Sequence, residues 1–344
     1  SCSDCADFTC SCIRGGNSRH TRGETELNIV VLEQNSIGLD IDLSIYEEFG
    51  NVTYYANTVN EVAERIKDAD IVVANKAKLN EESLKDAKNV KLICEFATGY
   101  DNVDIEYCKK RGIVVANAVD YSTPAVAQHT FAMALYLLER LPFYDNYVKS
   151  GTYASQDRFS NFDRPFKELQ GKRWGIIGLG NIGKKAAQIA KAFGCEVVYY
   201  SVTGKNTNTD YQRVDFDELL NTCDFISVHC PLSDLTRDLI DYEAMKKMKK
   251  TAILINVARG PVVNNADLYR ALTEGEIYAA GLDVLEKEPI TEDNPLSRIK
   301  DSEKLIITPH MAWASTEART RLAKEVYENI KSFINGEKRN IVNM

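Results

Sequence analysis

Apolar residues are concentrated in short runs along this chain, and several of the runs are rich in β-branched side chains. Runs of this length and composition are typical of strands that are buried on both faces. In the first third of the sequence we expect strands at 28–32, 71–74, 90–94 and 112–116, with a helix at 59–69. Strands that alternate with helical segments indicate a parallel sheet with helices on its faces.

A longer apolar segment follows at Thr123. Pro124 can occupy the first turn of a helix. The sequence predicts one long helix from Ala125 to about Lys149, which links two domains or packs against another subunit. Residues 151–170 are polar and aromatic without periodicity, so we expect a loop or an extended arm there.

A second alternation of strands and helices begins at Lys172. We expect strands at 174–178, 196–200, 225–229, 252–256, 279–284 and 304–308. The predicted helices cover 182–193, 215–221, 266–274 and 315–336. The sequence therefore predicts an α/β protein with two Rossmann-like, doubly wound parallel-sheet domains.

The composition is that of a globular protein and excludes several classes of partner. The 344 residues suffice for about two domains, and 44% of them are apolar and 27% charged. The net charge of −8 gives no electrostatic reason to bind nucleic acid or an anionic membrane. No apolar run approaches the roughly 18 residues of a membrane span, and the start lacks a secretory signal. We expect a cytoplasmic protein that binds neither nucleic acid nor membrane.

The nine cysteines are distributed unevenly, with Cys2, Cys5, Cys10 and Cys12 crowded at the start. Single thiols scattered through the rest of an acidic chain indicate a reducing compartment. Four clustered thiols can hold zinc or an iron–sulfur cluster. Zinc ligands usually form two pairs further apart, however, and little apolar sequence surrounds these. We expect 1–26 to be a Cys-containing extension, unstructured or derived from cloning, and we predict no metal site.

The segment Gly178-Leu-Gly180-Asn-Ile-Gly183 has the pattern G-x-G-x-x-G between a predicted strand and a predicted helix. That context makes the motif specific for a dinucleotide. Gly178 permits the tight turn, Gly180 lets the backbone approach a pyrophosphate, and Gly183 allows the helix to pack closely. The helix amino terminus supplies free N–H groups to the phosphates.

The end of the next predicted strand distinguishes the two nicotinamide dinucleotides. An acidic residue there would hold the ribose 2′-hydroxyl of NAD, but Ser201 occupies the place and Glu196 lies at the other end of the strand. Ser201 and Thr203 would not repel a 2′-phosphate, and Lys205 can pair with one. We therefore expect NAD(P)H as cofactor, with NADP favoured over NAD.

Three polar residues, Arg259, Glu288 and His310, each follow a predicted strand of the second half. Ligands of doubly wound folds bind at the carboxyl ends of the strands, so these residues are predicted to meet. The planar fork of an arginine suits a carboxylate and a carbonyl, and a histidine beside a carboxylate suits proton transfer. The set fits the reduction of a 2-oxo acid. We assign no catalytic role to His129 or His229.

These motifs, in this order, resemble the D-isomer-specific 2-hydroxyacid dehydrogenases from about Leu27 to the carboxyl terminus. The resemblance implies that Arg259 binds the carboxylate and carbonyl oxygen of the substrate. It also implies that His310 is the acid–base residue and Glu288 its partner.

The same resemblance implies a substrate loop at 97–104, and we expect Trp313 to form a wall of the pocket. Besides Arg259, the predicted substrate-binding residues are Thr98, Gly99, Tyr100 and Trp313. Asp283 corresponds to the family position that contacts the nicotinamide. With the glycine turn and the segment after the next strand, the predicted cofactor-binding residues are Gly178, Gly180, Asn181, Ile182, Gly183, Ser201, Thr203, Lys205, Cys230, Pro231, Thr236, Val257, Ala258 and Asp283.

The family fold implies a split substrate domain. Its parts would be 27–122 and 312–344, with 123–311 forming the inserted dinucleotide-binding domain and hinges near 121–124 and 309–313. Family members are usually dimers joined through the cofactor domains, so we expect a homodimer. The long helix and the arm at 151–170 are the expected contact.

Three stretches, at 97–102, 121–128 and 310–319, resemble the glycerate dehydrogenase (hydroxypyruvate reductase) branch of the family. We therefore expect a small anionic substrate, with hydroxypyruvate reduced to D-glycerate and glyoxylate to glycolate. A D-lactate dehydrogenase-type reductase of 2-oxo acids is the alternative enzyme. A dinucleotide-sensing binding protein without catalysis is the alternative from another class.

Overall fold

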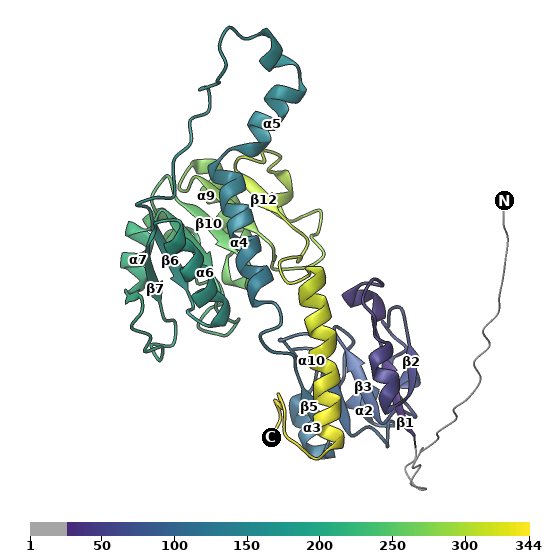
Figure 1. Cartoon of the computed structure of the whole chain (residues 1–344). Coiled ribbons are helices and arrows are strands. Elements are labelled where there is room, and N and C mark those ends of the chain that lie inside the picture. Colours follow the sequence, from purple (N-terminus) through teal and green to yellow (C-terminus); the bar gives the residue numbers. More distant parts are fainter. Residues whose placement is uncertain (1–25) are drawn as a thin grey trace, which may run out of the picture.

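The computed structural model describes residues 26–344, which form two parallel sheets covered by helices (Figure 1). Every paired strand in both sheets runs parallel to its neighbours. The predicted fold class, two Rossmann-like parallel-sheet domains, is therefore confirmed. The clustered cysteines Cys2, Cys5, Cys10 and Cys12 lie outside the described residues.

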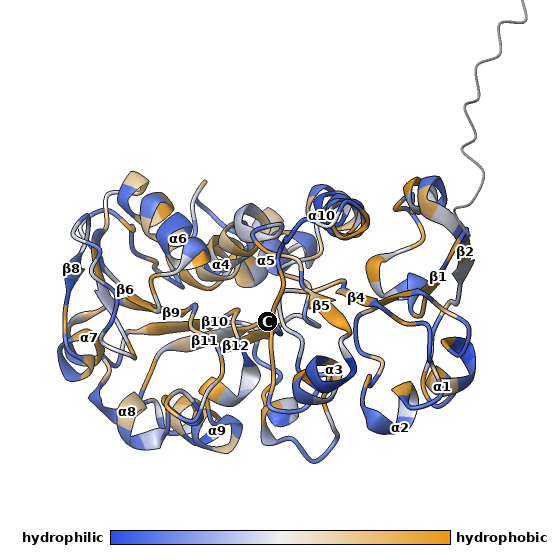
Figure 2. Ribbon diagram, turned by 90° about the horizontal axis from the view of Figure 1, so that it is seen from below, coloured by the Kyte–Doolittle hydropathy of each residue, from blue (hydrophilic) through white to orange (hydrophobic). Residues whose placement is uncertain are grey.

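The first sheet has the strand order β2-β1-β3-β4-β5. Its strands are β1 Leu27–Val31, β2 Gly50–Tyr54, β3 Ile71–Ala74, β4 Leu92–Glu95 and β5 Val114–Ala116. Its helices are α1 Val62–Arg65, α2 Glu81–Leu84, α3 Ile105–Arg111 and α10 Thr316–Ile334. Side chains alternate along β1 and β3: Ile29 and Ile71 pack with α10, whereas Val30 and Val72 pack with α1–α3 on the opposite face (Figure 2).

The second sheet has the order β12-β11-β10-β9-β6-β7-β8. Its strands are β6 Arg173–Ile177, β7 Glu196–Tyr200, β8 Gln212–Arg213, β9 Phe225–Val228, β10 Ile253–Asn256, β11 Ala279–Leu282 and β12 Leu305–Ile307. Its helices include α4 Thr123–Leu138, α6 Asn181–Ala192, α7 Phe216–Thr222, α8 Tyr242–Lys247 and α9 Asn265–Glu274. From β6 the strand order proceeds to β7 and β8 on one side, and from β9 to β12 on the other. Doubly wound folds bind their ligands at such a switch point, here between β6 and β9.

The predicted continuous helix from Ala125 to Lys149 is wrong. The chain instead forms α4 and a separate helix, α5 Leu141–Lys149, joined through Arg140 in the left-handed conformation with φ of 52°. The cause is Pro142, because a proline removes one helical hydrogen bond and its ring collides with the carbonyl four residues earlier. That carbonyl belongs to Leu138, the last residue of α4.

Residues 141–168 project from the second sheet as an arm (Figure 1). The arm contains α5 and the 3₁₀ turn η3 Thr152–Ser155, and its returning segment has no further helix or strand. Arg140 fixes the base of the arm, because its side chain donates to the carbonyl oxygen of Pro165 at 3.0 Å and pairs with Glu303 at 3.2 Å.

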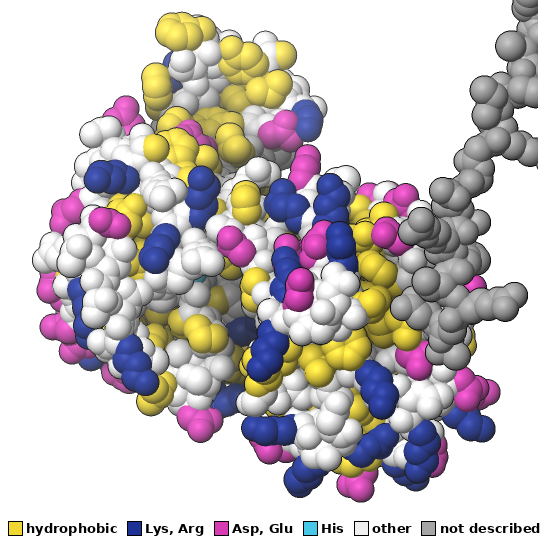
Figure 3. Space-filling model, turned by 60° about the horizontal axis from the view of Figure 1, so that its bottom comes forward, with side chains coloured by type: hydrophobic (Ala, Val, Ile, Leu, Met, Phe, Trp, Pro, Cys, Tyr) yellow, Lys and Arg dark blue, Asp and Glu magenta, His cyan; other side chains and the backbone are white. Residues whose placement is uncertain are grey.

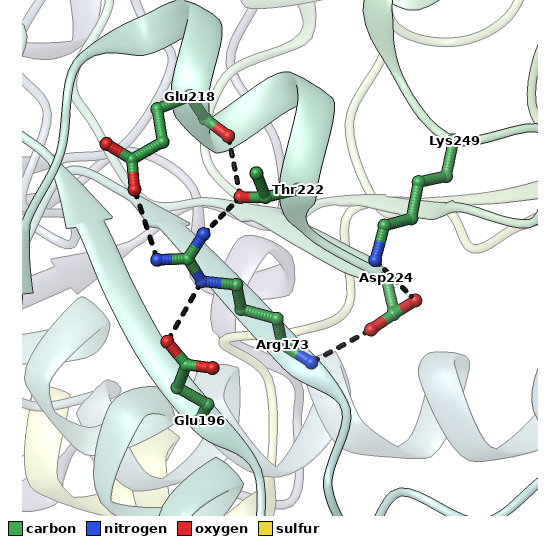
Figure 4. Close-up of polar contacts among 6 residues, drawn as sticks. All are labelled: Arg173, Glu196, Glu218, Thr222, Asp224 and Lys249. Atoms are coloured by element: carbon green, nitrogen blue, oxygen red, sulfur yellow. Dashed lines mark hydrogen bonds and ion pairs between the residues drawn. The ribbon is translucent and has the colours of Figure 1, made fainter.

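A polar network ties the amino-terminal edge of the second sheet (Figure 4). Arg173, at the start of β6, lies at its centre and is 17% exposed. Its side chain contacts Glu196 at 3.1 Å, Glu218 at 3.2 Å and Thr222 at 2.5 Å, while its backbone N–H donates to Asp224. These contacts join two strands and a helix at the amino-terminal ends of the strands, opposite the carboxyl ends where doubly wound folds bind ligands, so we assign the network to stability.

None of the described helices is both long and apolar enough to cross a lipid bilayer.

Candidate active site

The second sheet brings several predicted functional segments to one edge. Gly178, Cys230, Val257 and Asp283 lie just after the carboxyl ends of β6, β9, β10 and β11, respectively. Because all these strands are parallel, their carboxyl ends face the same side of the sheet.

The glycine turn after β6 has the geometry of a phosphate site. Gly178 adopts φ of 92°, and a Cβ there would lie 2.8 Å from the backbone N of Cys230. A Cβ on Gly183 would lie 2.2 Å from the carbonyl oxygen of Gly178, so the start of α6 packs directly on the turn. A Cβ on Gly180, by contrast, would have no atom within 4 Å. The space over Gly180 and the free N–H groups of α6 fit the pyrophosphate of a dinucleotide.

The other predicted cofactor residues divide by exposure. Asn181 and Pro231 are exposed, Ile182 and Ala258 are partly buried, and Cys230 and Val257 are buried.

Thr236 is only 2% exposed, and its hydroxyl is used within its own loop. It donates to the carbonyl oxygen of Pro231 at 2.8 Å and accepts from the N–H of Ser233 at 2.7 Å. In this structure Thr236 therefore shapes the loop after β9.

The segment after β7 carries polar and basic groups and no carboxylate at its start. Ser201 is buried, while Thr203 and Lys205 are exposed. Asn206 ties this segment to the glycine turn, because its side chain donates to the carbonyl oxygen of Leu179 at 2.9 Å. A second cation lies here as well.

That cation is Arg213 on β8, whose guanidinium donates to the carbonyl oxygen of Gly204 at 3.0 Å. Sequence reasoning missed it, because β8 has two exposed residues and therefore no hydrophobic pattern. Only its positive charge a few residues beyond Lys205 was visible.

His310 and Glu288, which are predicted to act as an acid–base pair, contact each other. Nδ1 of His310 lies 2.6 Å from Oε2 of Glu288, and Oε1 of Glu288 accepts the N–H of Leu285 at 2.9 Å. Burial opposes ionisation of Glu288, but these hydrogen bonds outweigh it and lower the pKa of the carboxyl below its ordinary value. An ionised Glu288 fixes the proton of His310 on Nδ1, which leaves Nε2 for a substrate.

Asp283 fixes the turn that carries His310. Its buried carboxylate accepts the hydroxyl of Thr308 at 2.6 Å and the backbone N–H groups of Met311 and Ala312 at 2.7 and 2.8 Å. His310 itself has φ of 55°, in the left-handed region that a non-glycine residue seldom adopts. The structure thus shows that Asp283 holds the turn after β12. Its contact with the cofactor stays a prediction.

Arg259 lies beside the predicted substrate loop, which belongs to the first sheet. A Cβ on Gly99 would lie 2.8 Å from Nη2 of Arg259, so the guanidinium is against the loop backbone. The loop is held by Thr98, whose hydroxyl donates to the carbonyl oxygen of Ala118 at 2.8 Å and whose carbonyl accepts the side chain of Asn117 at 2.8 Å. The structure therefore joins residues from both sheets in one site.

Trp313 lies between the two units, because it packs against a core cluster of each. Its ring is edge-on to Tyr121, with the centroids 6.4 Å apart. Burial raises the pKa of Tyr121 to about 12, although the charge of Arg259 opposes the shift. Tyr100, also predicted to bind substrate, is partly buried in the loop itself.

The predicted substrate loop contacts Glu95 through Asn102, and the sequence analysis overlooked Glu95. Glu95 ends β4 and is fully buried, and the side chain of Asn102 donates to it at 3.2 Å and to the carbonyl oxygen of Ala77 at 3.0 Å. Burial raises the pKa of Glu95 well above its usual range, against the effect of the Asn102 hydrogen bond. A glutamate at the end of an apolar run was the only signal.

Among residues 26–344, no three His, Cys, Asp or Glu side chains are arranged to hold a metal ion.

A glycine turn shaped for a dinucleotide and a histidine–carboxylate pair, both carried by loops of one parallel sheet, are together the features of a dinucleotide-dependent dehydrogenase. Residues 131–312 match the family described as D-isomer specific 2-hydroxyacid dehydrogenase, NAD binding domain. The chain belongs to the D-isomer-specific 2-hydroxyacid dehydrogenase family. It is therefore an oxidoreductase that uses a nicotinamide dinucleotide, in a family whose substrates are small 2-oxo and 2-hydroxy acids.

The chain is 38% identical to a hydroxypyruvate reductase of Blautia hydrogenotrophica over 325 residues, which cover 92% of this chain and all of the relative. It is 38% identical to a glycerate dehydrogenase of Methylorubrum extorquens over 285 residues, which cover 83% of this chain and 89% of the relative. The crystal structure of a D-lactate dehydrogenase from Aquifex aeolicus, complexed with NAD and lactic acid, superposes with a TM-score of 0.79 at 31% sequence identity. The match covers 92% of this chain and 99% of the chain in that structure. The resemblance to the glycerate dehydrogenase branch is confirmed.

Proposed function

We propose that the protein reduces hydroxypyruvate to D-glycerate, and glyoxylate to glycolate, with NAD(P)H. The observation that carries the proposal is the position of Arg259 against Gly99, because it places a guanidinium and the backbone of the substrate loop side by side. Two relatives that align with most of the chain are named for hydroxypyruvate reduction and glycerate oxidation, which supports the choice among 2-oxo acids.

Each polar group of the site then has one task. Arg259 binds the carboxylate of the substrate and polarises its carbonyl, with the N–H groups of the Thr98–Gly99 loop as further donors. When bound, the nicotinamide dinucleotide supplies the hydride. Nε2 of His310 gives its proton to the oxygen that develops negative charge, and Glu288 stabilises the positive charge of the imidazolium before that transfer.

The test is the loss of nicotinamide absorbance when purified protein is mixed with hydroxypyruvate, glyoxylate or pyruvate. We expect hydroxypyruvate to be the fastest substrate and His310→Ala to reduce kcat by about 10²–10⁴-fold, the usual contribution of a general acid. Fastest turnover of pyruvate would overturn the substrate and favour a D-lactate dehydrogenase. Tight dinucleotide binding without turnover of any of the three acids would favour a dinucleotide sensor.

We propose NADP as the favoured dinucleotide. Lys205 and Arg213 are two cations at the segment where an NAD-specific site would carry a carboxylate, and Arg213 already contacts that segment through Gly204. Arg213→Ala combined with Lys205→Ala is expected to raise KM for NADPH at least tenfold and to leave KM for NADH within twofold. A wild-type preference for NADH, or equal effects on both dinucleotides, would contradict this assignment.

We propose a homodimer that forms through the arm. The arm exposes several large apolar side chains, which Figure 3 shows gathered on the projection. They are Leu141, Val148, Tyr153, Phe159, Phe162 and Phe166. Isolated exposed apolar residues are common, but a projecting group of this size indicates a protein contact. Sedimentation of the wild type should give a dimer and Phe159→Ser with Phe162→Ser a monomer; a wild-type monomer would refute the proposal.

We propose residues 27–122 and 312–344 as the substrate domain and 123–311 as the dinucleotide-binding domain. Leu322 and Val326 of α10 share a core with Ile29 and Val31 of β1, which supports assigning the last helix to the first sheet. Closure about hinges at 121–124 and 309–313 would exclude water from the site. Small-angle scattering should show a smaller radius of gyration with dinucleotide and product bound, and no change would count against closure.

A further inference from the structure

His129 lies on α4 and contacts the residues that support the acid–base turn. Its Nε2 is 2.9 Å from the hydroxyl oxygen of Thr308. Thr308 donates its only hydroxyl hydrogen to Oδ1 of Asp283 at 2.6 Å. Thr308 can therefore only accept from His129, which requires the proton of a neutral His129 to be on Nε2.

Asp283 is the point at which this chain of contacts reaches His310. Its two carboxylate oxygens accept the N–H groups of Met311 and Ala312, the two residues after His310. The backbone N–H of His310 also donates to the main-chain oxygen of Asp283 at 2.9 Å. A left-handed non-glycine residue persists only where its surroundings fix it firmly, so the orientation of the Asp283 carboxylate decides where His310 lies.

His129 is also the basic side chain nearest to that buried carboxylate. Its Nε2 lies 3.6 Å from Oδ1 of Asp283, and within residues 26–344 no other Lys, Arg or His side chain approaches it within 4.0 Å. The side chain of Asp283 is 1% exposed and that of His129 is 24% exposed. Replacement of His129 therefore removes a polar contact at the edge of the fold rather than a large part of its core.

We propose that His129 is a positioning residue for the acid–base histidine: through Thr308 it orients the Asp283 carboxylate, which sets the turn that presents His310. The inference rests on the proposed function only in the experiments that measure catalysis. Within residues 26–344, His129 has no hydrogen bond or ion pair to the predicted substrate loop or to the glycine turn, so its effect on the rate of the chemical step should exceed any effect on dinucleotide binding through Asp283.

The test uses the full chain and three substitutions at two positions in this series of contacts. His129→Leu removes the donor, His129→Gln keeps a side-chain N–H, and Thr308→Val removes the intermediate hydroxyl at nearly constant shape. We expect His129→Leu and Thr308→Val each to lower kcat for hydroxypyruvate roughly tenfold to a hundredfold, as displacement of a catalytic group does. The dissociation constant of the dinucleotide should change less than kcat does. His129→Gln should recover most of the rate.

Because the two residues act in series, the double variant should be no slower than either single variant. Gln128→Ala is the matched control, since Gln128 is the exposed neighbour of His129 on α4, and it should retain the wild-type rate. Multiplicative losses in the double variant, an unchanged kcat in His129→Leu or no recovery by His129→Gln would each overturn the proposal.

A spectroscopic readout separates this inference from the proposed function. The chain has four histidines, so the ring-nitrogen resonances of His310 can be assigned by single substitutions. His129→Leu should shift the Nδ1 resonance of His310, because the Glu288 hydrogen bond changes when the turn moves. A wild type that turns over no 2-oxo acid would refute the proposed function, whereas an unshifted His310 resonance would refute the positioning role.

Discussion

Two glycines of the phosphate turn are expected to respond oppositely when each is replaced by alanine. In Gly183→Ala the new Cβ would lie 2.2 Å from the carbonyl oxygen of Gly178 and 3.2 Å from Cγ2 of Ile176. The close atom is backbone and cannot rotate away. Ordinary contact begins at 3.4 Å, so α6 must move about an ångström from the sheet. In Gly180→Ala the new Cβ meets no atom within 4 Å.

The stability change follows from this difference. Overpacking of a closed interior costs typically about 1–3 kcal/mol. The backbone contact at Gly183 places it towards the upper part of that range, at about 2–3 kcal/mol, or a fall in Tm of roughly 4–12 °C. Gly180 has φ of −81°, which alanine adopts freely. Gly180→Ala should therefore keep the wild-type stability or gain up to about 1 kcal/mol through the unfolded state.

Dinucleotide affinity should fall in Gly180→Ala, the variant whose stability is not reduced. The methyl group of Gly180→Ala occupies the space proposed for the pyrophosphate, so we expect about tenfold to a hundredfold weaker binding, or about 1.4–2.8 kcal/mol. Calorimetry without ligand measures the fold, and fluorescence titration with NADPH and NADH measures the site. Gly180→Ala should also lose the rise in Tm that saturating dinucleotide gives the wild type. Undiminished affinity in Gly180→Ala would refute the placement of the phosphates, and an unchanged Tm in Gly183→Ala would refute the packing argument.

Three further substitutions test the buried and networked polar groups. Burial lowers the pKa of His229 to about 3. The free energy of unfolding of the wild type should therefore fall as pH drops from 6.5 towards 3, by at most about 1.4 kcal/mol per pH unit. Urea titrations at pH 7 and 5 should show that His229→Asn lacks this slope. Burial raises the pKa of Glu95, so the stability that its neutral carboxyl contributes is complete below pH 4.5 and is lost as pH rises through the raised pKa. Glu95→Gln should remove this loss. Parallel stability curves of wild type and variant from pH 5 to 8 would contradict the burial argument. Arg173→Met should cost about 1–2 kcal/mol, because its partners Glu196 and Glu218 stay solvated; a loss above about 4 kcal/mol by urea denaturation would show that the network is stronger than its exposure indicates.

Buried strands were predictable because their apolar runs are continuous, as β3 and β4 illustrate with every residue buried. The strands that the sequence analysis omitted are β2 and β8, which lie at the two sheet edges and are partly or fully exposed. An edge strand needs no continuous apolar run, so its pattern does not differ from that of a loop. The break at Arg140 had a visible cause in Pro142, but the apolar pattern on both sides concealed it.

The parts of the site that the motifs identified are those fixed by chain order. Arg259 and His310 each follow a strand, and the parallel sheet brings both to one edge. Their supporting contacts depend instead on tertiary approach between distant segments. His129 and Thr308 are 179 positions apart, and nothing in either local sequence connects them. A pattern confined to a window of the sequence cannot detect such a pair.

Two loops, one from each sheet, are held by the same physical device. Oε2 of Glu33 accepts three consecutive backbone N–H groups, at Asn75–Ala77, at 2.8, 2.8 and 3.0 Å. Asp283 accepts two consecutive N–H groups beyond His310 at 2.7 and 2.8 Å. Both carboxylates are buried, at 7% and 2% exposure, and hydrogen bonds to a charged acceptor are about twice as strong as neutral ones. Loops beside a substrate crevice have little apolar packing to fix them, since one of their sides must stay open to ligands. A buried carboxylate fixes the backbone from the closed side, and so each sheet can present a rigid loop to the site.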